Sequence, residues 1–173
     1  MRRLVWLTAF VIVLAAPAVA FAYTGDGQDD GTLSVKAGVG KVYLNFNGSA
    51  VGRVRDGSIR VNDPVVDDGV GFEFHGCEVV INKSDSTATT SDKIKICKGD
   101  DIRFRVIGGN YKIAIAGVGI NLSAVGHGTA SLDGAGNDPS VSGPDGTYSL
   151  NDASYKSLPN LMTVFPLAAP SGQ

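Results

Sequence analysis

The chain has 173 residues, with 15 basic and 17 acidic side chains, a net charge of −2 and two cysteines. This length suits a single domain with a sizeable core. The acidic balance, with no basic stripe along the sequence, argues against nucleic acid as a partner. Fifteen of the acidic residues are aspartate, which favours turns, whereas glutamate favours helices.

The N-terminus has the pattern of a secretory signal. Arg2 and Arg3 precede an apolar stretch, which Pro17 ends before a run of small residues. The motif Ala20-Phe21-Ala22 fits a cleavage site, so we expect residues 1–22 to be removed and the mature chain to start at Tyr23, although cleavage after Ala20 also fits. The alternative is an uncleaved membrane anchor over residues 4–22, since about 20 apolar residues can cross a bilayer.

Removal of this segment leaves 13 of the 15 basic residues against all 17 acidic ones, a net charge of −4. We expect a flexible linker over residues 23–32, a single all-β domain over 33–166 and a C-terminal tail over 167–173. The domain is expected to be secreted or associated with the cell envelope. It meets a membrane only if the signal segment stays uncleaved.

The apolar residues of the mature chain recur with a period of two. Residues 41–46, 58–61, 102–106 and 129–132 each alternate apolar with polar side chains, as in half-buried strands. Gly-rich turn sequences such as AGVG, RDG and IGGN separate them. The pattern predicts an all-β fold of ten to twelve short strands, arranged as an antiparallel sandwich or barrel. A β-solenoid is the alternative, but no constant repeat length extends over more than two copies.

Cys77 and Cys97 form an even pair in an exported chain, which predicts a disulfide. The segments CEVVIN and DKIKIC flank a polar loop and predict an antiparallel hairpin that the bridge closes near its base. One detail conflicts with this geometry. Alternation places Cys77 on the face of Val79 and Ile81, whereas it places Cys97 on the face of two lysines, Lys93 and Lys95. A bulge or a strand end at one cysteine would remove the conflict.

Two hexapeptides, NGSAVG at 47–52 and NLSAVG at 121–126, nearly repeat one another. Their surroundings predict an internal duplication of residues 33–61 in residues 104–132. We then expect Val51 and Val125 to be buried at comparable positions, and the Asn that opens each copy to stand at a turn. The polar residues of the two copies are the candidate ligand-binding residues; the alternative is that they cap their own turns. These candidates are Asn47, Ser49, Asn121 and Ser123.

Sequence motifs for catalysis are missing. The chain has no G-x-S-x-G, S-x-x-K or H-E-x-x-H, and no glycine loop for a dinucleotide. His75 and His127 are the only histidines, and no spacing supports a metal site. We therefore expect no catalytic residues, no metal and no cofactor.

The runs GTLSVKAGVGKVYL, GSAVGRV, IRFRVIGGNYKIAIAGVGINLSAVG and DGTYSL resemble a group of uncharacterised small exported all-β proteins of high-GC Gram-positive bacteria. The resemblance implies export and an all-β domain, and it supplies no active-site residues. Two functions follow as hypotheses. The first is an exported non-enzymatic β domain with a binding or cell-envelope structural role, whose extracellular or envelope partner is unknown. The alternative is an extracellular carbohydrate-active hydrolase that uses a carboxylate pair, for which Glu73 and Glu78 are candidates.

Overall fold

The computed structural model describes residues 30–64, 71–84, 93–136 and 145–169. These residues form an eight-stranded antiparallel sheet without helices, so the all-β prediction is confirmed. The predicted signal segment lies outside the described residues, among which no helix is long and apolar enough to span a membrane. The strands are β1 (Gly31–Asp63), β2 (Phe72–His75), β3 (Val79–Ser84), β4 (Lys93–Val106), β5 (Asn110–Gly134), β6 (Thr147–Leu150), β7 (Lys156–Ser157) and β8 (Thr163–Leu167).

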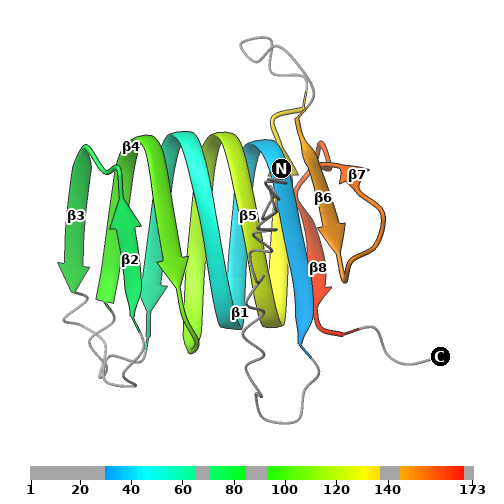
Figure 1. Cartoon of the computed structure of the whole chain (residues 1–173), viewed down its shortest axis with the longest axis horizontal. Coiled ribbons are helices and arrows are strands. Elements are labelled where there is room, and N and C mark those ends of the chain that lie inside the picture. Colours follow the sequence, from blue (N-terminus) through cyan, green and yellow to red (C-terminus); the bar gives the residue numbers. More distant parts are fainter. Residues whose placement is uncertain (1–29, 65–70, 85–92, 137–144, 170–173) are drawn as a thin grey trace, which may run out of the picture.

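Two long strands, β1 and β5, wind around each other as an antiparallel coil (Figure 1). Most of their residues pair on both sides: Ile115 of β5 lies between Val42 and Ile59 of β1. One turn of the coil therefore takes 17 residues of β1. β4 and β2 continue the sheet at one end, and β8 continues it at the other. The sheet does not close into a barrel.

Glycines mark the corners of the coil. In β1 they stand at Gly31, Gly40, Gly48 and Gly57, alternately nine and eight residues apart, which is half a turn. Corner glycines of neighbouring strands lie side by side, as Gly57 does with Gly117. A Cβ at Gly57 would lie 2.2 Å from a main-chain oxygen, so only glycine fits. The backbone can therefore bend without ending the strand, and the short strands predicted from the sequence merge into long ones.

The corners divide the coil into two layers that face each other across the core. Each stretch of strand between two corners, called a pass below, lies in one layer. Alternation within a pass sends every second side chain inward. One inward row crosses five neighbouring strand passes, and each of its residues is at most 1% exposed. Burial of such aliphatic side chains contributes about 1.5–3 kcal/mol each. The row consists of Leu132, Val42, Ile115, Ile59 and Cys97.

The predicted hairpin and disulfide are both present. β3 pairs antiparallel with β4, and the sulfur atoms of Cys77 and Cys97 are 2.04 Å apart. Cys97 is fully buried, whereas Cys77 lies just before β3 begins at Val79. The conflict between the faces of the two cysteines disappears because one of them stands at a strand end.

The prediction that Val51 and Val125 are buried is wrong. Val51 is 50% exposed and Val125 is 41% exposed, while Ala50 and Ala124 point into the core. The two hexapeptides pair directly with each other, with Ala50 opposite Ala124. The small inward alanines fit where the layers come close to the corner, and the valines take the outer face. The valines do occupy comparable positions, but the duplication itself stays a hypothesis.

The expected turns at the two asparagines are also wrong. Asn47 lies within β1 and Asn121 within β5. Asn47 is next to the corner glycine Gly48, and Asn121 lies two residues after Gly119; at both places the strand bends but continues. The sequence therefore indicates a change of direction correctly, but glycine produces it inside the strand.

Candidate functional site

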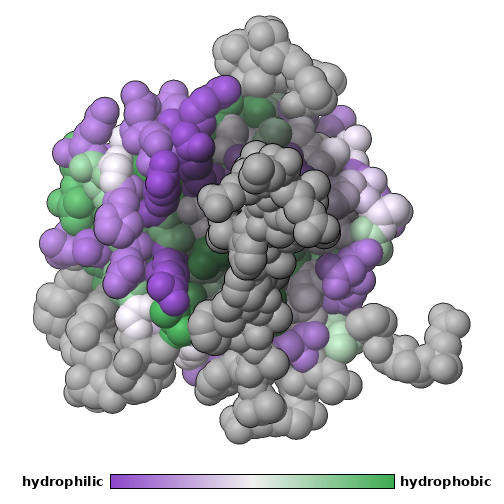
Figure 2. Space-filling view, viewed as in Figure 1, coloured by the Kyte–Doolittle hydropathy of each residue, from purple (hydrophilic) through white to green (hydrophobic). Residues whose placement is uncertain are grey.

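Outward side chains of one layer form two rows that run across the strands. Neighbouring passes lie about 4.8 Å apart, so side chains in register are close neighbours. In the first row, Arg53 of β1 lies between Asn121 of β5 and Arg103 of β4. In the second row, Val51 lies between Ser123 and Arg105. Residues distant in the sequence thus share one surface, where hydrophilic side chains gather toward the upper left of Figure 2.

A shallow hollow of about 500 Å³, wide open to solvent, lies between these rows. Its floor is mainly apolar and includes Leu122 and Phe104. Its cations are Lys36, Arg53 and Arg103, and no carboxylate lines it among the described residues. We call this hollow the basic groove. An apolar floor with a few convergent polar groups is the usual form of a small-molecule site.

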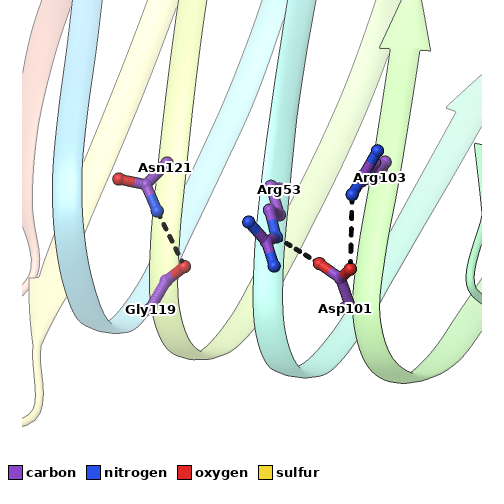
Figure 3. A network of polar contacts seen from close by, with 5 residues as sticks. All are labelled: Arg53, Asp101, Arg103, Gly119 and Asn121. Carbon is purple, nitrogen blue, oxygen red and sulfur yellow. Dashed lines mark hydrogen bonds and ion pairs between the residues drawn. The ribbon is translucent and has the colours of Figure 1, made fainter.

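Asp101 holds the two arginines of the groove. Its carboxylate accepts a hydrogen bond from Arg53 Nε, and its second oxygen lies 3.5 Å from Arg103 Nη2 (Figure 3). Asp101 stands at a corner of β4 with φ +54°, a left-handed conformation that aspartate and asparagine tolerate better than most residues. All three side chains stay about half exposed or more, so an incoming anion can reach the arginines.

The two arginines stand directly opposite each other on neighbouring strands. Like charges in this arrangement destabilise a sheet, and Asp101 offsets part of the repulsion. A single carboxylate shared by two guanidinium groups leaves most of their donors free for another acceptor. The arrangement is therefore suited to binding an anion.

The opposite end of the groove carries a lysine and a tyrosine. Lys36 Nζ lies 4.1 Å from the centre of the Tyr155 ring, and the Tyr155 hydroxyl is 2.9 Å from Ser34 Oγ. The hydrogen bond from Ser34, followed by Lys36, lowers the pKa of the Tyr155 phenol. The contact between Lys36 and the Tyr155 ring orders the lysine side chain, which would otherwise be free in solvent.

Two further hollows continue the groove at its ends. One shares Ser34 and Ser123 with it and reaches Asp152; the other shares Arg103 and includes Asp100. Acidic groups therefore lie at both ends of the basic groove. A ligand that lies along the whole face needs its negative charge in the middle and neutral polar groups at the ends.

The four predicted ligand residues separate into two pairs. Asn121 and Ser123 line the basic groove. The Asn121 side chain also donates to Gly119 O at 3.1 Å and accepts from Ala37 N at 3.1 Å, which fixes it at the corner. Ser49 Oγ accepts a hydrogen bond from Gly108 N at 2.9 Å, so it holds the bend between β4 and β5 rather than its own turn.

Asn47, the fourth predicted residue, pairs across the corner with His127 and Asn110 and lines none of the hollows described above. His127 Nδ1 lies 3.3 Å from an Asp30 oxygen, so this histidine has a local partner. The corner at Asn47 therefore has structural contacts and lies apart from the groove.

The carboxylates named for a hydrolase lie at the β2 end of the sheet. Glu73 stands opposite Arg105, and Glu78 lies in the segment before β3 that contains Cys77. The hydrolase alternative stays a prediction. Within the described ranges, no cluster of three or more His, Cys, Asp or Glu side chains is placed to hold a metal ion.

No local pattern in the sequence marks the arginines or Lys36 as ligand-binding residues. Their charges are scattered along the sequence, and only the register of the coil brings them together. No family model, curated protein or solved structure matches this chain. The argument for function therefore depends on the geometry of the site, and the resemblance to exported bacterial proteins stays a prediction.

Proposed function

We propose that this chain is an exported, non-enzymatic binding domain that holds a segment of an acidic glycan in the basic groove. The observation that carries the proposal is the set of three cations, Lys36, Arg53 and Arg103, around an apolar floor. All three belong to strands of one coiled sheet, so the site is rigid before the ligand arrives.

The chemistry of the groove suits a sugar that carries a carboxylate. Guanidinium groups bind carboxylates through two parallel hydrogen bonds, which fix the orientation of the acid. The apolar floor suits the C–H face of a sugar ring. Ser123 and Asn121 can exchange hydrogen bonds with its hydroxyl groups.

The charges on either side of the groove favour a glycan over nucleic acid. Asp152 and Asp100 lie in the adjoining hollows and repel a polymer with a phosphate on every unit. The net charge of −2 also opposes a densely charged polyanion. A glycan with an acidic unit between neutral units meets the cations at the centre and avoids the carboxylates.

A trisaccharide with one galacturonate between two galactose units, called the acidic trisaccharide below, is a suitable probe because it carries its single carboxylate in the middle. We expect Arg53→Gln/Arg103→Gln to weaken its binding by about tenfold or more, because charge-assisted hydrogen bonds contribute roughly 1.5–3 kcal/mol. Asp101→Asn should tighten binding by about three- to fivefold, since it frees both arginines and keeps a residue that tolerates this backbone conformation. Isothermal titration calorimetry measures both effects.

Lys98→Gln is the matched control, because Lys98 is exposed on β4 but lines no part of the groove. It should leave the affinity within about twofold of the native value. Equal affinities for the native chain, the arginine variant and Asp101→Asn would contradict the proposal. So would tighter binding of single-stranded DNA than of the acidic trisaccharide at the same salt concentration.

A further inference from the structure

The opposite layer of the coil carries a second hollow, of about 400 Å³. Along β1, the groove residues Val51 and Arg53 lie between the corners Gly48 and Gly57. The residues of the second hollow lie in the passes before and after those corners, so they face the other side of the molecule. Binding in one hollow therefore leaves the other accessible.

The second hollow forms because a small residue stands between two large ones. Ala114 of β5 pairs with Tyr43 on one side and with Arg60 on the other. The alanine gives a low floor, and the two larger side chains form walls. Tyr43 is 36% exposed, so part of its ring is open to a ligand. We call this site the Tyr43 hollow.

A row of polar side chains runs along the Tyr43 hollow. Lys112 stands between Asn45 and Asn62, and Thr129 follows beyond Asn45. These groups supply an ammonium, two amides and a hydroxyl, and no carboxylate lines the hollow among the described residues. The ligand that fits has a face that stacks on an aromatic ring, several hydroxyl groups and an acidic substituent.

We propose that the Tyr43 hollow is a second binding site for an acidic sugar unit, so that one domain bridges two glycan chains. The bridging part rests on the proposed function of the basic groove. Tyr43 stacks on the sugar ring, the Asn45 amide and the Thr129 hydroxyl bind its hydroxyls, and Lys112 pairs with the acid. Two sites on opposite layers face away from each other and engage separate chains.

The number of acidic trisaccharide molecules bound per domain tests this arrangement. Calorimetric titration of the native chain should give two sites. Tyr43→Ala/Lys112→Gln and Arg53→Gln/Arg103→Gln should each give one, and the two double variants combined should give none. Tyr43→Phe should stay within about threefold of the native affinity, because the stacking face remains, whereas Tyr43→Ala should lose about tenfold at that site.

The outcomes separate the two proposals. One site in the native chain that survives Tyr43→Ala/Lys112→Gln would overturn the second site and leave the groove intact. One site that is lost in that variant but kept in the arginine variant would support the Tyr43 hollow and overturn the groove and the bridging. With both sites confirmed, light scattering of a partially methyl-esterified polygalacturonate, in which neutral units separate the acidic ones, should rise on adding the native chain, but not on adding either double variant. An equal rise with a one-site variant would overturn bridging.

Discussion

Replacement of Gly57 by alanine is expected to lower the free energy of unfolding by about 2–5 kcal/mol. Gly57 has φ +153°, a backbone conformation that residues other than glycine rarely adopt. The new Cβ would also lie 2.2 Å from the main-chain oxygen of Ala116, so two packed passes of the coil must move apart. Urea unfolding followed by circular dichroism measures the loss.

Gly71→Ala is the matched control for the corner. Beyond its chain neighbours, no atom of the described residues lies within 4 Å of a Cβ at this position, so we expect a change within about 0.5 kcal/mol. If Gly57→Ala and Gly71→Ala unfold at the same urea concentration as the native chain, then close approach at the corners does not hold the coil together.

Loss of the bridge between Cys77 and Cys97 is expected to cost about 2–4 kcal/mol, because it lets the unfolded chain open a loop of 20 residues. Cys77→Ser/Cys97→Ser tests this, with an added contribution from the hydroxyl at position 97, where the cysteine is fully buried. The native chain with reductant, unfolded beside the same chain without it, isolates the bridge itself. Identical midpoints in those two titrations would show that the bridge contributes nothing.

Strand positions and core faces could be predicted from the sequence because alternation is a local property. Val42, Leu44 and Phe46 are buried as expected, and so are Ile102 and Phe104. The disulfide was also predictable, since only two cysteines exist in the chain. These features need no knowledge of which strands pair.

The coil could not be predicted in the same way. The corner glycines were interpreted as turns between short strands, because turn chemistry and a sharp bend inside a strand use the same residue. The signal that would have distinguished them is the spacing of Gly31, Gly40, Gly48 and Gly57, which alternates between nine and eight residues. This spacing corresponds to half a turn of the coil. It does not stand out as a repeat of constant length, because intervals of nine and eight residues alternate.

The candidate site depended on the coil for its assembly. Asn121 and Ser123 were selected for their place in a repeated hexapeptide, and they do line the groove. Arg53 and Arg103 come from segments 50 residues apart, and nothing local marks them as partners. Only the pairing of β1 with β4 places them side by side.

Location of the bound glycan on the molecule tests the central claim most directly. Addition of the acidic trisaccharide to the ¹⁵N-labelled chain should shift the backbone amide signals of Arg53, Arg103 and Ser123 in a saturable way. The same signals should not move with the uncharged trisaccharide of galactose. Saturable shifts confined to residues outside the basic groove, or no saturable shift at all, would contradict the account.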